Sequence, residues 1–419
     1  MQKLTLILLL LGGLQHLQAQ SFDIGCDGSR YIQDVFPSFK KTTVQYATAV
    51  NQANIQVTLS MDVYEPVNDN VAARPVIVLA HGGSFIFGDK TDMASWCQRL
   101  AKKGYVVATI QYRLYPVLLL GFPDSISIFG TAIRAVGDMK AAVRYFRQDA
   151  DNANLFRADP TNIFIGGYSA GAVTALHTGF LDDDDVVPGF LQTILDANGG
   201  LNGNTGTATN QSYSSSSKAV VSMSGGIYRS DWVDSLGLPL VSIHGDSDGT
   251  VPYLSGLAAG IAYLEGSGRI HPKAEAAGLL NYLITVPGGD HTDVYDPAKT
   301  QFVPYVDSFI LTATTMLEFL ACQGISAAPE AAGIAENWSL YPNPVTTGAF
   351  TIQLPEATGQ VQVTVTDLSG RLILVSNNIR NGQEIRTGNL SAGVYTIRVT
   401  DTDDPGRLFQ VKKLVIQKG

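Results

Sequence analysis

The stretch "NIFIGGYSAGAVTALHTGF" (residues 162–180) joins a short apolar segment to a helical pattern through a turn of small residues. Ser169 lies at the centre of this turn in the order Gly-x-Ser-x-Gly, with Gly167 and Gly171 two positions away on either side. A sharp turn from a strand into a helix leaves no room for side chains beside the serine, so its hydroxyl projects above the sheet. The helix start also offers free N–H groups to a developing negative charge. The stretch therefore predicts a nucleophile.

The surrounding sequence, residues 74–286, alternates short apolar runs with helical patterns, which is typical of a mostly parallel sheet with helices on both faces. The expected strands are Val76–Ala80, Val106–Ile110, Ile163–Ile165, Ala219–Met223, Leu240–Ile243 and Leu283–Val286. Residues Thr91–Lys103 and Ala132–Arg147 have helical spacing. The alternation in Ile55–Tyr64 predicts antiparallel strands at the sheet edge.

Length and composition allow a large core and more than one domain, since the chain has 419 residues, 45% of them hydrophobic, and a net charge of -9. The acidic balance argues against nucleic acid as a partner. Residues 1–19 resemble a signal peptide cut after Ala19. No later stretch approaches the roughly eighteen apolar residues of a membrane span. We therefore expect a soluble, exported protein without a transmembrane segment.

Three cysteines, Cys26, Cys97 and Cys322, allow one disulfide in an oxidising compartment and leave one thiol. The sequence does not determine the pair. We expect a bridge that uses Cys97, with either Cys26 or Cys322 as its partner.

Two further loops are expected to supply an acid and a base for Ser169. "SIHGDSDGTVPY" (residues 242–253) follows a predicted strand and offers Asp246 and Asp248. Asp248 matches the acid of an H-G-x-x-D-x-x-V-P arrangement, whereas we interpret Asp246 as a turn residue and His244 as a packing residue at the strand end. "VPGGDHTDVY" (residues 286–295) places His291 after the last predicted strand, where a general base can reach the serine.

The other histidines fit this role less well. His16 falls in the signal peptide, His177 in the helix after Ser169, and His271 precedes Pro272 in an expected surface loop. The chain order serine, aspartate, histidine predicts a catalytic triad of Ser169, Asp248 and His291.

The small residues of "HGGSFIFGDK" (residues 81–90) allow backbone amides to approach a substrate oxyanion. We expect the N–H groups of Gly83 and Ser84, together with that of Ala170, to form an oxyanion hole, and His81 to support the loop. No zinc or phosphate-loop pattern occurs in the sequence, so we expect no metal and no cofactor.

Two stretches interrupt the α/β pattern. The polar insertion Asn198–Ser217 is expected to be a surface loop, with a lid over the pocket as the alternative. Small residues over 324–337 predict a linker between a catalytic domain (residues 20–323) and an all-β sandwich (residues 338–419).

The β-rich end carries "LYPNPVTTGAFTIQL", "VTDLSGRLI" and "LSAGVYTIRV". It resembles the type A C-terminal sorting domain of the type IX secretion system. The resemblance implies that the secretion machinery is a partner and that the protein is secreted or attached to the cell surface.

The stretch from about Tyr46 to Leu320, with "HGGSFIFGDK" and "GYSAGA", resembles the carboxylesterase branch of the α/β-hydrolase superfamily, in its type B and hormone-sensitive-lipase-like members. The resemblance implies hydrolysis of esters through an acyl-enzyme. Ser84 stands where these families usually have a third glycine, and the acid motif is more similar to that of feruloyl-esterase relatives.

Surface export, which the resemblance to the sorting domain implies, suggests polysaccharide-linked acetyl or feruloyl esters as substrates, and short-acyl esters fit the same triad. Polyesters or lipids are the alternatives. A serine exopeptidase of the prolyl-oligopeptidase type shares the triad order, but no blade-length repeat precedes this domain. A binding protein that keeps the fold without the chemistry is the remaining alternative, and the presence of all three triad residues argues against it.

Overall fold

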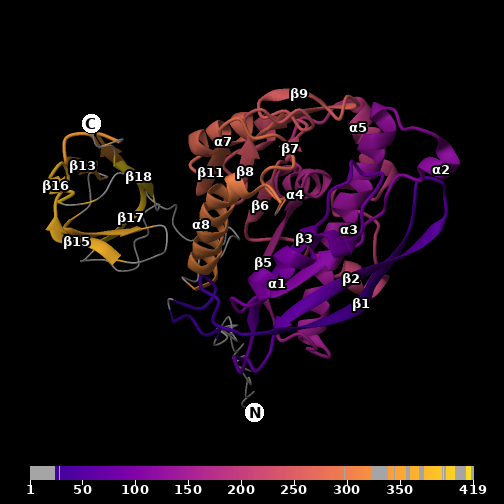
Figure 1. The fold of residues 1–419 in the computed structure, drawn as a ribbon, viewed down its shortest axis with the longest axis horizontal. Coiled ribbons are helices and arrows are strands. Elements are labelled where there is room, and N and C mark those ends of the chain that lie inside the picture. The colour runs from indigo at the N-terminus through magenta and orange to yellow at the C-terminus, as the bar shows by residue number, and fades with distance from the viewer. Residues whose placement is uncertain are drawn as a thin grey trace, which may run out of the picture.

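The computed structural model describes residues 24–322 except 28 and 297, and residues 338–416 except 344, 355–358, 368–371, 389, 391–392 and 402–411. The predicted signal peptide and the predicted linker lie outside the described residues. What is described forms a large α/β part and a smaller β part (Figure 1).

The large part is built around an eight-stranded sheet in the order β1-β2-β4-β3-β5-β6-β8-β11. The strands are β1 (Phe39–Val50), β2 (Gln56–Pro66), β3 (Arg74–Ala80), β4 (Val106–Ile110), β5 (Ala158–Tyr168), β6 (Val220–Met223), β8 (Leu240–Gly245) and β11 (Asn281–Val286). β2 is antiparallel to both of its neighbours, and all other pairs are parallel. The sheet is therefore mostly parallel with antiparallel pairing at one edge, as the sequence predicts.

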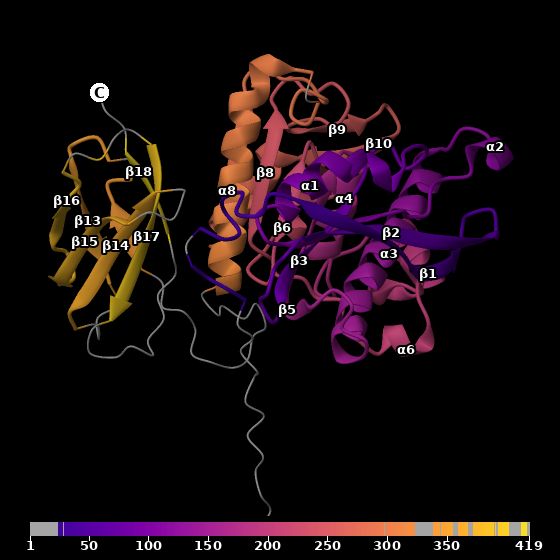
Figure 2. The same ribbon diagram turned by 60° about the horizontal axis from the view of Figure 1, so that its bottom comes forward.

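Helices cover both faces of this sheet (Figures 1 and 2). They are α1 (Ala94–Ala101), α2 (Val117–Leu120), α3 (Ser125–Asp151), α4 (Ala170–Phe180), α5 (Gly189–Ala197), α6 (Ala208–Gln211), α7 (Ser267–Ala276) and α8 (Val303–Cys322). A small sheet, β7 (Gly226–Ile227), β10 (Ala262–Gly266) and β9 (Ser255–Ala258), completes the large part.

The central strand β3 explains why both faces need cover. Val76 and Val78 enter the core shared with α3 and α4, whereas Ile77 and Leu79 enter the core shared with α1 and α8. Successive side chains of a strand point to opposite faces, so an unbroken apolar run requires helices on both sides.

The helix α8 is the one described helix long and apolar enough, by length and composition alone, to cross a membrane. Half of the most apolar 18-residue stretch of this helix is buried. Phe309, Met316 and Leu317 are among the residues that pack into the core beside α1 and the sheet. Burial against the sheet therefore accounts for the apolar character of α8.

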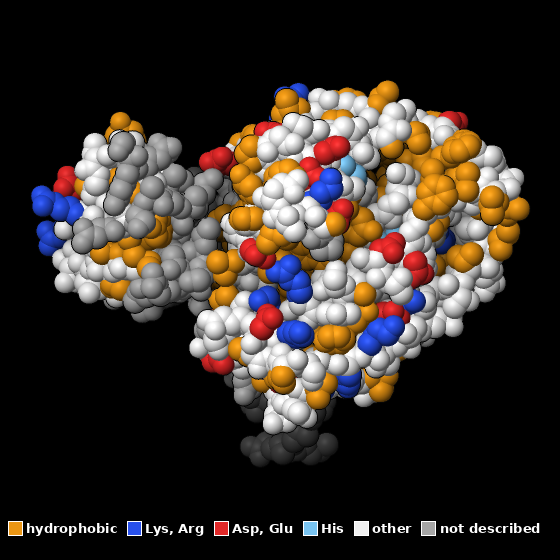
Figure 3. All heavy atoms as spheres, viewed as in Figure 1, with side chains coloured by type: hydrophobic (Ala, Val, Ile, Leu, Met, Phe, Trp, Pro, Cys, Tyr) orange, Lys and Arg blue, Asp and Glu red, His pale blue; other side chains and the backbone are white. Residues whose placement is uncertain are grey.

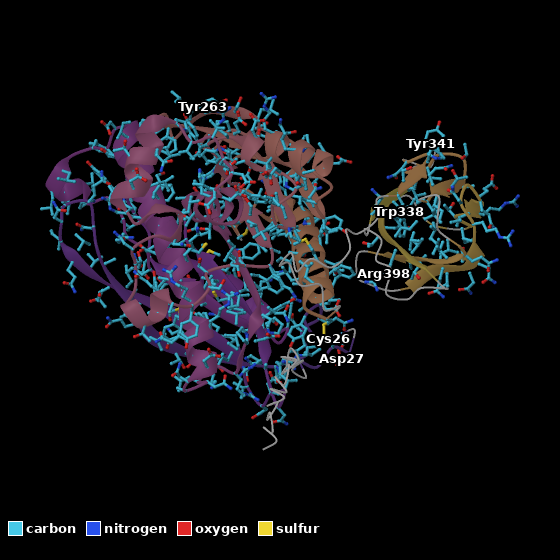
Figure 4. All side chains as sticks on the ribbon, turned by 180° about the vertical axis from the view of Figure 1, so that it is seen from behind. Cys26, Asp27, Tyr263, Trp338, Tyr341 and Arg398 are labelled. Atoms are coloured by element: carbon cyan, nitrogen blue, oxygen red, sulfur yellow. A yellow bond between two sulfur atoms is a disulfide. The ribbon has the colours of Figure 1, made fainter. Side chains whose placement is uncertain are left out.

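The disulfide joins Cys26 to Cys322, with a Cα–Cα distance of 5.8 Å, and Figure 4 shows Cys26 at one end of α8. Cys97 is a free, buried thiol. The prediction of a bridge through Cys97 is therefore wrong. The reason is the orientation of α1, which turns Cys97 into the core together with Trp96 and Ala101.

The insertion Asn198–Ser217 is held by two buried basic side chains, Arg144 on α3 and Arg113 in the segment after β4. Arg144 donates to the carbonyl oxygen of Thr205 at 3.0 Å, and Arg113 donates to Thr205 Oγ1 at 2.7 Å. None of the insertion's residues lines the pocket beside Ser169. In the described structure the insertion is a tethered surface segment and not a lid.

The β part has two sheets around its own core. One contains β12 (Ser339–Tyr341), β13 (Ala349–Gln353) and β16 (Glu384–Arg386), and the other contains β15 (Leu372–Ile379), β14 (Val361–Asp367), β17 (Gly393–Asp401) and β18 (Lys412–Ile416). Trp338, Phe350 and Ile397 are among the buried residues between them. The arrangement agrees with the predicted sandwich.

Candidate active site

Ser169 occupies the sharp turn between β5 and α4. Its φ of 52° lies in the left-handed region, which residues other than glycine rarely adopt. A Cβ atom on Gly167 or Gly171 would overlap the carbonyl oxygen of Ala80 on the neighbouring strand β3. Both glycines are therefore required by the close approach of β3 to the turn, which agrees with the prediction from the sequence pattern.

Asp248 and His291 lie beside Ser169, on loops that follow β8 and β11. His291 Nε2 is 2.8 Å from Ser169 Oγ, and His291 Nδ1 is 2.7 Å from Asp248 Oδ2. All three residues are buried. The carboxyl ends of parallel strands meet at one edge of the sheet, which brings together residues that lie far apart in the sequence.

The contacts define where the proton of the imidazole lies. A carboxylate oxygen only accepts, so His291 Nδ1–H donates to Asp248. Nε2 is then the free acceptor for the Ser169 hydroxyl proton. This is the tautomer that a general base for Ser169 requires.

A second histidine contacts the same carboxylate. His244 Nε2 lies 3.2 Å from Asp248 Oδ2 and 3.0 Å from the carbonyl oxygen of Val251. Both partners are acceptors, so Nε2 carries a proton, while Nδ1 pairs with Ser267 Oγ at 2.9 Å. Interpreting His244 as a packing residue missed this contact, for which the four-residue spacing from Asp248 was the available signal.

Asp248 remains ionised in this environment. Burial raises the pKa of its carboxyl, but the hydrogen bonds with His244 and His291 outweigh burial and hold the pKa below its usual range. The backbone amides of Thr250 and Val251 also donate to Oδ1, both at 2.8 Å. A fixed negative charge is therefore available to stabilise a protonated His291.

The neighbouring acids hold the loops together. Asp246 is exposed and accepts from the Gly288 amide at 2.7 Å, which places it in a turn. Asp290, which sequence reasoning did not single out, accepts from the amides of Gly249 and His291 at 3.0 and 2.7 Å. These bonds tie the loop of His291 to the loop of Asp248.

The loop after β3 brings backbone amides next to Ser169. Gly83, Ser84 and Phe85 all have positive φ values, of 109°, 53° and 63°. In the described part of the chain, no backbone carbonyl accepts from the amides of Gly83, Ser84 or Ala170. These three amides are thus free to bind an oxyanion.

His81 lies beneath this loop. Its Nδ1 pairs with the carbonyl oxygen of Gly82 at 2.7 Å, and its ring stacks on Tyr112 with 4.4 Å between centroids. Burial lowers the pKa of His81, so the ring is neutral at pH 7. These contacts are those of a residue that supports the loop, as expected.

A pocket next to Ser169 has an empty volume of about 550 Å³, including open solvent. Its walls come from the loop after β3, from α3 and α4, from the loop after β8 and from the β9–β10 hairpin. The lining residues are Ser84, Phe85, Ile128, Phe129, Ala132, Ala170, Val173, His177, Thr250, Val251, Ala258, Ala259, Ile261, Ala262 and Leu264. Burial lowers the pKa of His177 to about 4, so this histidine is neutral at pH 7. The pocket is therefore apolar and uncharged.

One expectation about the histidines is wrong. His271 is buried in α7 and pairs with Asn281 through Nδ1 at 3.1 Å, whereas the sequence suggested a surface loop. The helix α7 continues through Pro272, so the proline gave a misleading signal.

Two family models match this chain. Residues 61–233 match BD-FAE, and residues 339–417 match the secretion system C-terminal sorting domain. The large part has the α/β-hydrolase fold, and residues 339–417 are similar to the secretion system C-terminal sorting domain. The first match covers the turn around Ser169 and the loop after β3, and it ends before Asp248 and His291.

Similar proteins include several esterases. Esterase-5C of Drosophila miranda is 28% identical over 133 residues, which cover 32% of this chain and 23% of that protein. Juvenile hormone esterase of Heliothis virescens is 34% identical over 109 residues, which cover 26% of this chain and 18% of that protein. A probable isoprenylcysteine alpha-carbonyl methylesterase of Oryza sativa subsp. japonica is 29% identical over 181 residues, which cover 42% of this chain and 38% of that protein. The chain thus spans less than two fifths of each relative.

Among solved structures, esterase 2 of Thermogutta terrifontis phosphorylated by paraoxon aligns with 19% identity and a TM-score of 0.47. The alignment covers 70% of this chain and 97% of that one. The same esterase with propionate bound aligns with 20% identity and a TM-score of 0.46, at the same coverage.

Proposed function

We propose that the protein is an exported carboxylic ester hydrolase that forms an acyl-enzyme on Ser169. The observation that carries this proposal is the continuous hydrogen-bonded series from Asp248 through His291 to Ser169, with contacts of 2.7 and 2.8 Å. The BD-FAE match, which spans Ser169, and the similarity to esterases support the same reaction class.

In the proposed reaction, His291 Nε2 takes the proton of Ser169 as Oγ attacks the ester carbonyl carbon. The carbonyl oxygen becomes an oxyanion and accepts from the amides of Gly83, Ser84 and Ala170. The bond to the alcohol oxygen then breaks, and His291 returns the proton to the leaving alcohol. His291 next deprotonates a water molecule that attacks the acyl-enzyme, releases the acid and restores Ser169.

The pocket supports a neutral acyl group of modest size. No charged side chain lines it, so it has no partner for a charged substrate group. We infer short-acyl esters as substrates, including acetyl or feruloyl groups linked to a polysaccharide.

The decisive experiment is hydrolysis of p-nitrophenyl esters from acetate to long acyl chains, with acetylated xylan and methyl ferulate in parallel. Ser169→Ala is expected to abolish turnover while the protein remains folded. Ser222→Ala is the matched control, because Ser222 is buried on the adjacent strand β6 and its hydroxyl has no hydrogen-bond partner among the described residues.

Activity that survives Ser169→Ala would overturn the assignment of the nucleophile. If the native enzyme hydrolyses none of the esters but cleaves peptide substrates, it is a peptidase. Silence on both would indicate a binding protein.

We further infer that the sorting domain directs the enzyme through a type IX secretion system to the cell surface or the medium. The match over residues 339–417 supports this localisation. Removal of residues 338–419 in a host that has this system is expected to leave active esterase in the periplasm. Unchanged export of the shortened chain would contradict the inference.

A further inference from the structure

We propose that the mouth of the pocket is a docking surface for a water-insoluble aliphatic ester, so that the enzyme works at the surface of an aggregated substrate. The inference rests on the proposed function, and it specifies the physical state of the substrate. The surface, called the apolar rim below, consists of Phe87, Leu118, Leu119, Phe122, Ile126 and Leu257.

The apolar rim is unusually exposed. Leu118 is 97% exposed and Phe122 is 88% exposed, and α2 contains no buried residue. Single exposed apolar residues are ordinary, whereas Leu118, Leu119 and Phe122 are all exposed within one stretch of five residues, and a group of this kind marks a binding surface. Figure 3 shows hydrophobic side chains gathered at the upper right of the molecule, where Figure 1 places α2 and α5.

Three rim residues are close in sequence to residues that line the pocket. Phe87 is two positions after the lining residue Phe85 on the loop after β3, Ile126 is two positions before Ile128 on α3, and Leu257 directly precedes Ala258 on β9. Side chains at such spacings on a helix or a strand point in different directions, so the rim side chains are exposed beside the wall and do not line the pocket themselves. The segment that carries α2 is attached to the same wall, because the Tyr115 amide donates to the carbonyl oxygen of Phe85 at 2.7 Å.

Two of the segments that carry the rim contain no charged residue, although Asp124 is exposed between Phe122 and Ile126 and Asp89 is exposed two residues after Phe87. Residues 114–123 and 249–264 contain no Asp, Glu, Lys or Arg, in a chain in which 16% of residues are charged. Neither segment can recognise an acidic polysaccharide or an anionic membrane through ion pairs. Their chemistry suits an uncharged apolar surface, whose contact removes the rim from water.

A second copy of the chain is the competing occupant. A permanent dimer through the rim would cover the pocket beside Ser169 and exclude the substrate. An insoluble ester covers the same surface and at the same time delivers its acyl group to the pocket, which is why the geometry favours it.

The test measures adsorption to an emulsion of tributyrin. The variant Leu118→Ser/Leu119→Ser/Phe122→Ser is compared with the native chain, both carrying Ser169→Ala so that the emulsion is not consumed. Leu155→Ser/Leu236→Ser is the matched control. These leucines are each 60% exposed but precede β5 and β8, at the opposite end of the strands from the pocket.

Removal of each large apolar side chain from the contact weakens adsorption about tenfold, so adsorption of the triple variant is expected to fall about a thousandfold and that of the control variant little. With Ser169 restored, the native rate is expected to rise steeply once tributyrin exceeds its solubility, and the triple variant to lose this rise.

Equal adsorption of the triple variant and the native chain would overturn the proposal. A native dimer that the triple variant converts to a monomer would overturn it in favour of a second copy. Absence of ester hydrolysis by the native chain would overturn the proposed function instead, and it would leave the adsorption result to be judged separately.

Discussion

The two sides of Ser169 are built on different principles. On one side, His291, Asp248 and His244 form a buried polar series in which each imidazole N–H has an acceptor. On the other side, the pocket and the apolar rim offer aliphatic and aromatic side chains with no charge. The function of the polar side depends on the positions of single atoms, whereas substrate binding on the apolar side depends on the volume of the pocket and on its apolar surface.

The difference determines how each side tolerates change. Loss of one partner from a buried polar series leaves a charge or a donor unsatisfied, which is costly. Substitution in an apolar wall changes the packed volume, and the free energy of unfolding changes in proportion to the volume left empty. We therefore expect the largest effect from loss of the charge on Asp248 and the smallest from a change in the pocket wall.

The largest effect is expected for Asp248→Asn. The amide carries no charge to stabilise protonated His291 and favours the wrong tautomer, so kcat is expected to fall by about 10⁴. Asp246→Asn is the matched control two residues away, because its side-chain oxygen can still accept from Gly288. Hydrolysis of p-nitrophenyl acetate measures both, and equal losses would contradict the assignment of Asp248 as the acid.

The second effect concerns stability and pH. His177 is neutral because burial lowers its pKa to about 4, from 6.5 in the unfolded chain. Between pH 6.5 and pH 4 the unfolded state binds the proton first, so the free energy of unfolding falls as the pH falls, by up to about 3 kcal/mol. Denaturation by urea across this range is expected to show a shallower decline for His177→Gln.

If His177→Gln and the native chain lose stability in parallel from pH 6.5 to pH 4, then His177 is solvated, and the pocket is less apolar than its lining indicates. The contrast between the two sides of Ser169 would then weaken. Ser222→Ala serves as the control, since it changes a buried residue without changing a titratable group.

The proposed triad on the polar side could be predicted from the sequence, whereas the contact of His244 with Asp248 was missed. Ser169, Asp248 and His291 each follow a recognisable strand and occupy positions fixed by a motif, and the structure brings them within hydrogen-bond distance. The glycines around Ser169 were predictable because close backbone approach permits no side chain. Motifs of this kind reflect constraints that are local in the sequence.

The apolar side has no comparable signature. Ile128, Leu264 and Phe85 come from three separate segments, and nothing in their local sequence distinguishes a pocket wall from ordinary core. The disulfide was unpredictable for the same reason, because it depends on how α8 and the N-terminal segment meet in space. Packing between segments that are distant in the sequence determines the pocket wall and the disulfide, and the spacing of residues along the chain does not reveal that packing.

A third prediction concerns His244 as a positioning residue. His244→Phe removes one donor from Asp248, and kcat is expected to fall about tenfold with little change in KM, the usual scale for a hydrogen bond to a charged group. His244→Gln restores an N–H group and is expected to recover part of the loss. If both variants change only the melting temperature, His244 is a packing residue after all.

The smallest effect is expected in the pocket wall. Leu264→Ala enlarges the pocket, so the preference for hexanoate over acetate is expected to rise about fourfold for each additional methylene group accommodated. Leu191→Ala removes the same atoms from the same hydrophobic core but lies outside the pocket lining. In both variants the free energy of unfolding is expected to fall by the amount typical of truncating a buried leucine to alanine. A change of preference in Leu264→Ala alone shows that the wall sets acyl length, whereas the same shift in both variants would show that general loosening of the core does.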